Sequence, residues 1–374
     1  MSEVTKSAAP KRVLSGMRPT GRLHLGNYMG ALKNWVALQN ETLADGSPKY
    51  ECYFFIADWH ALTTDYADLS ELQPNIRQVA LDFLAAGLDP ERSTIFVQSD
   101  VKLHAELHVL LSNITPLGWL ERVPTYKDQQ EQLKEKDLAT YGFLGYPVLQ
   151  SADILIYRAD AVPVGQDQAA HVEITREIAR RFNHLYGSKR GAADAKSDKE
   201  RLAELEQETD VREILPEPKV LLTPSPKLPG TDGRKMSKSY GNTILLSDPE
   251  DQIRAKLKTM VTDPARVRRT DPGNPDICPV FDLHKVFSSA ELQAQAAEGC
   301  RTAGIGCIQC KGWVADAVVA ELKPIQERRQ MYEASPNLVD EILDAGGRRA
   351  WKQADATMSK VCAAMKLRYR STSL

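Results

Sequence analysis

Two short stretches of the 374-residue sequence combine glycines with side chains that can bind phosphate. The first, Ser15–Tyr28 (SGMRPTGRLHLGNY), runs from a predicted strand into a predicted helix, whose N-terminus offers unpaired N–H groups and partial positive charge. His24 and Asn27 lie three residues apart, so both can face one cleft and donate hydrogen bonds to a phosphate. Gly26 leaves room for a ribose or base to approach the backbone. A glycine-rich turn with a capping histidine explains this stretch equally well.

The second stretch is Gly230–Asn242 (GTDGRKMSKSYGN), in which Lys235 and Lys238 alternate with Ser237 and Ser239 between flanking glycines. A loop of this composition can bring two ammonium groups onto a polyphosphate. The plain alternative is a solvated basic loop. Two lysines alone would fit that alternative, but the complete string favours a phosphate-binding role.

Four of the six cysteines, Cys278, Cys300, Cys307 and Cys310, form the pattern C-x21-C-x6-C-x2-C. Buried apolar cysteines would be scattered along the chain, so this crowding favours a metal site in a reducing compartment. Four thiolates suit either a [4Fe–4S] cluster or tetrahedral zinc, and free thiols remain a third possibility. A second candidate, His104 and His108 in HAELH, lacks the H-E-x-x-H order of a zinc helix, because Glu106 is one position off.

The elements that must hold these residues alternate between strands and helices. Apolar runs predict buried strands at residues 13–17, 52–58, 93–99 and 160–164, and helical spacing predicts helices at 27–39, 73–86 and 168–183. This alternation predicts a Rossmann-like α/β domain with a parallel sheet over residues 11–246, after a disordered tail at 1–10. Residues 189–219 carry dense mixed charge and predict a solvated insertion, and residues 247–374 predict a mainly helical domain.

Composition narrows the class of protein. The chain has 42% hydrophobic and 26% charged residues, which excludes wholesale disorder. Its 48 Lys and Arg against 50 Asp and Glu give a net charge of -2, so nucleic acid must be bound by local basic patches. No apolar stretch is long enough for a membrane span, and the N-terminus lacks an apolar signal core. We therefore expect a cytoplasmic protein.

HLGN after a Pro-Thr-Gly turn, followed about 210 residues later by KMSKS, resembles the paired signatures of the class I aminoacyl-tRNA synthetases. The middle segments, YPVLQSADILIY and VPVGQDQAAHVEITREIARRFN, are similar to those of tryptophanyl-tRNA synthetases. This chain departs from the common family pattern at Arg18 and at Gln166, where relatives usually carry an acidic residue. The resemblance implies a tryptophan–tRNA ligase that forms tryptophanyl-adenylate and pyrophosphate from ATP and then transfers tryptophan to the 3′ end of tRNA(Trp).

The resemblance also implies roles for individual residues. It assigns catalysis to His24, Asn27, Lys235 and Lys238, and implies Mg²⁺ carried on the pyrophosphate. The indole N–H needs an acceptor in an apolar pocket, and Asp153 falls at the position that reads it, although pattern alone favours a surface aspartate. The ATP site implied by the resemblance comprises Arg18, Pro19, Thr20, Gly26, Asn27, Gly165, Gln166, Asp167, Lys235, Met236, Ser237, Lys238 and Ser239. The tryptophan site comprises His60, Tyr146, Asp153, Val162, Val164 and Gln168.

The cysteine spacing resembles the branch of this family that carries a [4Fe–4S] cluster in its anticodon-binding domain, with zinc as the alternative. Basic residues after Gly347 and around Arg254–Arg269 then favour a surface for tRNA, and the family implies a homodimer. Two other functions remain open at this stage. One is a tyrosine-activating ligase of the same class, and the other is a non-catalytic paralogue that binds tRNA.

Overall fold

The computed structural model describes residues 9–123, 137–165, 168–187, 197, 200, 210–222 and 227–371. Its centre is a five-stranded sheet in the order β3-β2-β1-β4-β5, and every strand pair is parallel. The strands are β1 (Lys11–Met17), β2 (Tyr50–Ile56), β3 (Ser93–Val97), β4 (Ala161–Val164) and β5 (Lys219–Leu222). Strand order reverses between β1 and β4, and in such sheets the crevice at the carboxyl ends of the strands flanking that point is where ligands bind.

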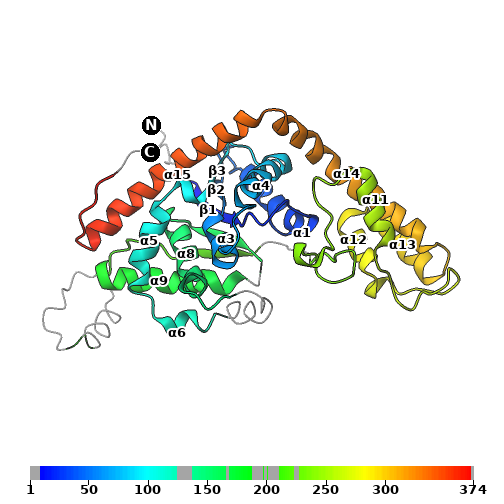
Figure 1. Cartoon of the computed structure of the whole chain (residues 1–374), viewed down its shortest axis with the longest axis horizontal. Helices are drawn as coiled ribbons and strands as arrows, with labels where there is room; N and C mark the ends of the chain where they lie inside the picture. Colours follow the sequence, from blue (N-terminus) through cyan, green and yellow to red (C-terminus); the bar gives the residue numbers. More distant parts are fainter. Residues whose placement is uncertain are drawn as a thin grey trace.

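Helices cover the sheet and continue into an arm (Figure 1). A helical run at the end of β1 comprises α1 (Leu25–Asn27), a π-helical turn (Tyr28–Leu32) and α2 (Lys33–Asn40). The other helices around the sheet are α3 (Asp58–Asp65), α4 (Leu72–Ala86), α5 (Leu103–Ser112), α6 (Leu117–Leu120), α8 (Tyr141–Ile156) and α9 (Ala169–Gly187). The C-terminal helices are α11 (Glu250–Thr259), α12 (Pro279–Phe287), α13 (Ala290–Arg301), α14 (Cys307–Glu333) and α15 (Pro336–Ala364). Short 3₁₀ turns lie at Gln98–Asp100, Lys238–Tyr240 and Pro275–Ile277.

Alternate residues of β2 build two cores, one on each face of the sheet. Phe54 stacks on Trp35 with ring centroids 4.8 Å apart, on the face that α2 and α4 cover. Tyr53 stacks on Tyr157 at 4.9 Å, on the face that α8 and α9 cover. The sheet is therefore buried on both faces, as a parallel sheet requires.

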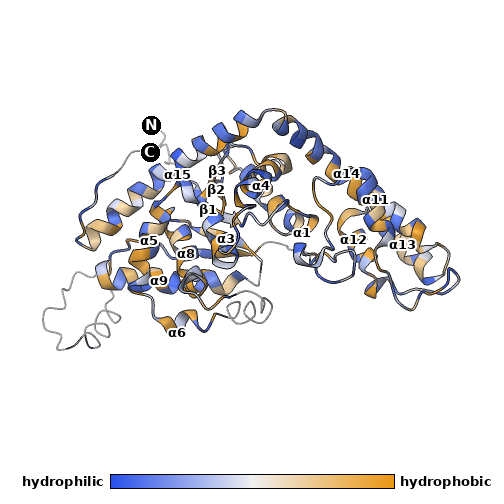
Figure 2. Cartoon of the chain, in the orientation of Figure 1, coloured by the Kyte–Doolittle hydropathy of each residue, from blue (hydrophilic) through white to orange (hydrophobic). Residues whose placement is uncertain are grey.

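The helix α15 returns from the arm and packs on the edge strand β3 (Figure 1). A Cβ atom on Gly346 would lie 1.7 Å from the carbonyl oxygen of Ile95, so only glycine permits this approach. The upper side of the arch formed by α14 and α15 is mostly hydrophilic (Figure 2). No helix within the described part of the chain is long and apolar enough to cross a membrane.

The predicted fold class is confirmed, with a parallel Rossmann-like sheet followed by a helical C-terminal region. The four predicted strands lie within a few residues of their expected positions. The edge strand β5 was missed, because it is short and half exposed in a charged stretch without apolar alternation. Most of the expected tail at 1–10 and most of the charged insertion at 189–219 lie outside the described residues. The boundary at 246/247 stays a prediction.

Candidate functional site: an adenylate-forming cleft

A cavity of about 370 Å³ opens where β1, β4, α3 and α8 meet. Apolar and aromatic side chains such as Phe55, Ile154 and Trp35 line it together with many polar groups, a mixture that suits a small molecule with both apolar and polar parts. The sheet brings these residues together because the cavity lies at the carboxyl ends of β1 and β4. All six residues expected to contact the amino acid line it: His60, Tyr146, Asp153, Val162, Val164 and Gln168.

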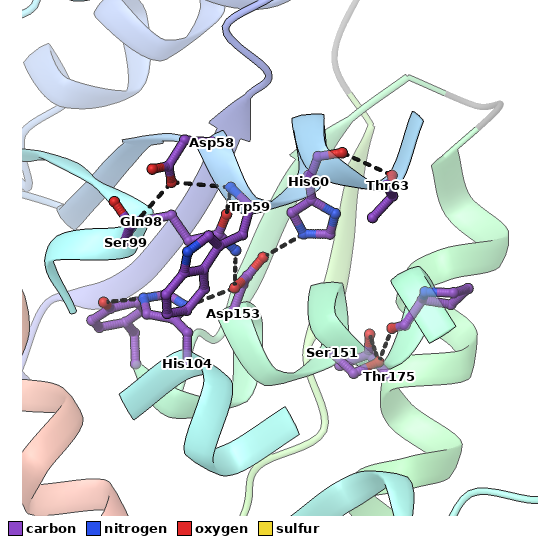
Figure 3. A network of polar contacts seen from close by, with 12 residues as sticks. Asp58, Trp59, His60, Thr63, Gln98, Ser99, His104, Ser151, Asp153 and Thr175 are labelled. Carbon is purple, nitrogen blue, oxygen red and sulfur yellow. Dashed lines mark hydrogen bonds and ion pairs between the residues drawn. The ribbon is translucent and has the colours of Figure 1, made fainter. Parts of the chain in front are cut away.

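The Asp153 carboxylate is the centre of the buried polar network shown in Figure 3. Its Oδ1 accepts hydrogen bonds from Gln98 Nε2 at 2.8 Å and from His104 Nδ1 at 2.6 Å. Its Oδ2 lies 2.8 Å from His60 Nε2. The Tyr157 hydroxyl oxygen lies 2.7 Å from His104 Nε2, the ring nitrogen that does not contact Asp153. The aspartate is therefore fixed from three sides before any ligand arrives.

Burial by itself raises the pKa of the Asp153 carboxyl, but hydrogen bonds from His104 and His60 outweigh burial and hold that pKa at about 2. Asp153 is consequently ionised at neutral pH, although it is 1% exposed. A carboxylate has about four lone-pair directions, and Oδ2 has the single described partner His60. An N–H donor entering the cavity can therefore bind to Oδ2.

A second chain of polar contacts includes other residues that line the same cavity. The Tyr146 hydroxyl is 2.9 Å from His171 Nε2, and His171 Nδ1 is 2.9 Å from Gln168 Oε1. The histidine thus links a side chain of α8 to the residue that precedes α9. This chain orients Tyr146 and Gln168 in the cavity wall.

The first stretch, Ser15–Tyr28, begins α1 with a reciprocal cap. The His24 Nδ1 accepts from the Asn27 backbone N–H at 3.3 Å, while Asn27 Oδ1 accepts from the His24 backbone N–H at 3.1 Å. A Cβ atom on Gly26 would lie 2.9 Å from the His24 ring, so glycine is needed for the ring to lie there. The capping explanation and the ligand-binding explanation of His24 therefore both fit this geometry.

His24 is a neutral donor. Burial, and then the charges of Lys238 and Lys235, lower the pKa of its imidazole to about 4. Because Nδ1 accepts a backbone hydrogen bond, the single proton of the neutral ring resides on Nε2. That N–H can donate to an anion without changing charge at neutral pH.

The second stretch folds against the first. Lys238 Nζ donates to the Gly21 carbonyl at 2.7 Å, where Gly21 has a φ of 110° that favours glycine. The buried Asn242 holds the loop by accepting from the Ser237 backbone N–H at 2.8 Å. Burial lowers the pKa of the Lys238 ammonium to about 8, Asp82 opposes this shift, and Arg18 adds to it.

Backbone hydrogen bonds join the two stretches directly. The Leu25 N–H donates to the Ile244 carbonyl, and the Leu246 N–H donates to the Leu23 carbonyl, each at 2.9 Å. The chain segment that follows KMSKS therefore runs antiparallel to the segment that contains His24. The structure thus brings together two sequence stretches that lie about 210 residues apart.

The remaining residues expected to bind ATP are distributed around this junction. Arg18 and Gly165 line the same cavity as Asp153, and Pro19 and Thr20 line a neighbouring cavity of about 310 Å³. Met236 is buried, whereas Lys235 and Ser239 are exposed. Gln166 and Asp167, the expected ribose contacts with Gly165, lie outside the described residues.

Comparison with known proteins places the chain in a family. The model of the tRNA synthetases of class I (W and Y) matches residues 6–323. The tryptophan–tRNA ligase of Ralstonia nicotianae is 50% identical, over 96% of this chain and 99% of that protein. That of Thermotoga maritima is also 50% identical, over 96% of this chain and its own full length.

The chain belongs to the class I tryptophan–tRNA ligases. The fold agrees, because the crystal structure of tryptophanyl-tRNA synthetase from Campylobacter jejuni complexed with ADP and tryptophan matches with a TM-score of 0.78. That structure is 34% identical and covers 95% of this chain and all of its own. The resemblance of HLGN, KMSKS and the middle segments to tryptophanyl-tRNA synthetases is thereby confirmed.

Several residues of the site carried no recognisable signal in the sequence. Sequence reasoning weighed His104 only as a doubtful zinc ligand with His108, but His104 is buried and binds Asp153, while His108 lines a separate cavity. Gln98 and His171 were not singled out. The one available hint was the position of Gln98 at the carboxyl end of β3, where ligand-binding residues collect.

The four cysteines gather in the arm, on three helices. Cys278 caps α12, Cys300 lies near the end of α13, and Cys307 and Cys310 occupy the first turn of α14. Cys278, Cys300 and Cys307 all contribute to raising the pKa of the Cys310 thiol, after the larger effect of burial, so the four sulfurs are near one another. Among the described residues, no three His, Cys, Asp or Glu side chains are arranged to hold one metal ion.

Proposed function

We propose that the chain activates L-tryptophan with ATP in the cavity that Asp153 lines and then transfers tryptophan to the 3′ end of tRNA(Trp). The observation that carries this proposal is an ionised, buried carboxylate in the wall of a pocket of amino-acid size. Asp153 Oδ2, which is bonded to His60, has a further lone pair that can accept a donor from the ligand, and the indole N–H is the only side-chain donor of tryptophan. Phenylalanine has no side-chain N–H and would forgo this hydrogen bond, so the site is expected to favour tryptophan over it.

The amino acid is held at both ends in this proposal. Asp153 Oδ2 accepts from the indole N–H, and His60, Val162 and Val164 flank the ring. Tyr146 and Gln168, which also line the cavity, bind the α-amino or carboxylate group. The tyrosine-specific alternative is not supported, because the relatives at 50% identity are tryptophan–tRNA ligases.

The ATP phosphates lie at the junction of the two signature stretches. In the reaction, the tryptophan carboxylate oxygen bonds to the α-phosphorus while the bond to pyrophosphate breaks. Negative charge develops on the phosphates, and it is stabilised by the His24 Nε2–H, Asn27, Lys235 and Lys238. The Met236 backbone binds adenine, Gly165 and Asp167 bind the ribose, and Mg²⁺ is carried on the pyrophosphate. No residue of the chain needs to act as a nucleophile.

Basic residues supply candidate contacts for tRNA. Lys360, Lys366, Arg368 and Arg370 are exposed near the C-terminus. Arg349 is already engaged, because it donates to the carbonyl oxygens of Pro90 and Ser93, so it contributes less to such a surface than the charge pattern suggested. We also propose that the chain works as a homodimer with one tRNA bridging two subunits, as the family resemblance implies.

Pyrophosphate exchange into ATP, measured separately with tryptophan, tyrosine and phenylalanine, tests the proposal. Exchange that depends on tryptophan alone is the expected result. Exchange with tyrosine would contradict the amino-acid assignment. Exchange with none of them would favour the non-catalytic alternative.

We further propose that Cys278, Cys300, Cys307 and Cys310 hold a [4Fe–4S] cluster. The donor set fits, because four cysteine thiolates are the usual ligands of such a cluster. Gly273 packs directly against the Cys300 sulfur, because a Cβ atom at that position would lie only 2.7 Å from it. The cluster would be structural, joining α12, α13 and α14.

Metal analysis of the protein purified without oxygen tests the cluster. About four iron atoms and four sulfides per chain, lost in Cys307→Ser, are expected. Cys362→Ser is the matched control, because Cys362 is a buried cysteine on α15, outside the group. One zinc per chain would support the alternative metal, and full iron content in Cys307→Ser would contradict the assignment.

A further inference from the structure

Two side chains of the helix α14, about one turn apart, link it to the two signature regions: one reaches the first stretch through Asp82, and the other reaches the segment that follows the second stretch. Arg329 and Asp82 form an ion pair between α14 and α4, and they are 4% and 1% exposed. Arg329 also donates to Gln78 on α4 and, at 2.8 Å, to Glu333 one turn further along α14. The guanidinium is thereby fixed in orientation, and so is the carboxylate that it binds.

The other oxygen of Asp82 reaches the first signature. Its Oδ2 accepts from the Leu23 backbone N–H at 2.7 Å, immediately before His24. Burial raises the pKa of the Asp82 carboxyl, and the charge of Arg329 and the hydrogen bond from Leu23 oppose this shift. The carboxylate therefore joins a C-terminal helix to the backbone of the His24 turn.

Three residues before Arg329, the same face of α14 reaches the segment that follows KMSKS. Gln326 Nε2 donates to the Leu246 carbonyl at 3.1 Å and to the Asp248 carbonyl at 2.8 Å. The Leu246 N–H in turn donates to the Leu23 carbonyl. The contacts form a closed ring, from Gln326 through Leu246, Leu23 and Asp82 to Arg329 and back along α14.

We propose that Asp82, Gln326 and Arg329 are positioning residues for ATP, a role that rests on the proposed function. None of the three lines the amino-acid cavity. Instead, the three residues fix the position of the backbone at Leu23 relative to the backbone at Leu246. His24 directly follows Leu23, and Lys238 precedes Leu246 in the chain. The relative position of the two backbone segments therefore decides whether the His24 and Lys238 side chains can bind the same phosphates. A displacement of about 1 Å in such a site is enough to cost about 100-fold in rate.

Arg329→Met with Arg328→Met as control tests the proposal. Both arginines lie on α14 and contact the α4 region, but Arg328 donates only to the Ala85 carbonyl among its described hydrogen bonds. We expect Arg329→Met to lower kcat/KM for ATP about 10-fold in pyrophosphate exchange, while the dissociation constant for tryptophan stays within about twofold. Arg329→Lys keeps the charge and recovers part of the loss. Arg328→Met leaves ATP kinetics unchanged.

Gln326→Leu is a second test in case Arg329→Met does not fold. Because Gln326 is only partly buried, its replacement should be tolerated by the fold. It is expected to lower kcat/KM for ATP about threefold without affecting tryptophan binding. Equal losses for ATP and tryptophan in either variant, or unchanged ATP kinetics in both, would overturn the positioning role. A wild-type chain without tryptophan-dependent exchange would instead refute the proposed function, and ATP binding by the variants would then be measured by dialysis.

Discussion

The two ends of the cleft are built differently. At the amino-acid end, helices α3, α5 and α8 hold Asp153 in a buried network that is complete without ligand. At the phosphate end, two backbone segments are joined by hydrogen bonds, and Lys235 remains exposed. Selection of a side chain needs a rigid, desolvated acceptor, whereas stabilising a transient charge needs cations that adjust to the polyphosphate. Damage at the two ends should consequently appear in different kinetic constants.

We expect the largest loss of catalytic efficiency from the Asp153→Ala substitution. It removes the proposed indole acceptor and leaves the buried donors of Gln98 and His104 unpaired. We expect kcat/KM for tryptophan to fall about 1000-fold, through a raised KM, with weaker discrimination against phenylalanine. Ser151→Ala is the control, because Ser151 is equally buried on α8 but bonds to Thr175. An unchanged KM for tryptophan in Asp153→Ala would remove Asp153 from the binding site.

Lys235→Ala tests the phosphate end. Its ammonium is proposed to act on charge that develops in the transition state, so kcat should fall about 100-fold while tryptophan binding changes little. Single-turnover adenylate formation and equilibrium binding of tryptophan measure the two quantities separately. Arg234→Ala is the matched control, since Arg234 is an exposed neighbour paired with Asp232. Parallel losses in binding and rate would contradict the transition-state role.

The pH dependence of kcat/KM for ATP is a further test of the phosphate end of the cleft. Lys238, with its pKa lowered to about 8, is protonated below that pH and loses its charge above it. We expect kcat/KM to fall about 10-fold between about pH 7 and pH 9. His24, with its pKa lowered to about 4, stays neutral over this range and adds no inflection near pH 6.5. In Lys238→Arg the decline should disappear, and a decline that persists would assign it to another group.

Local features of the sequence predicted most of the strands and helices of the α/β domain. Apolar runs located four of the five strands, because a strand buried on both faces needs such a run. The edge strand β5 lacks that requirement and was missed. The helix N-terminus at His24 and the lysines of KMSKS were recognisable because glycine and charge act over a few residues.

The partners of these residues were decided by tertiary structure. The sequence determined that Asp153 is a carboxylate among apolar neighbours, but pattern alone favoured a surface position for it. Its actual donors, Gln98 and His104, lie 55 and 49 residues away. The Asp82–Arg329 pair joins positions 247 residues apart. Hydrogen bonds between distant buried groups depend on how whole helices pack, and a single sequence carries no local periodicity that records such packing.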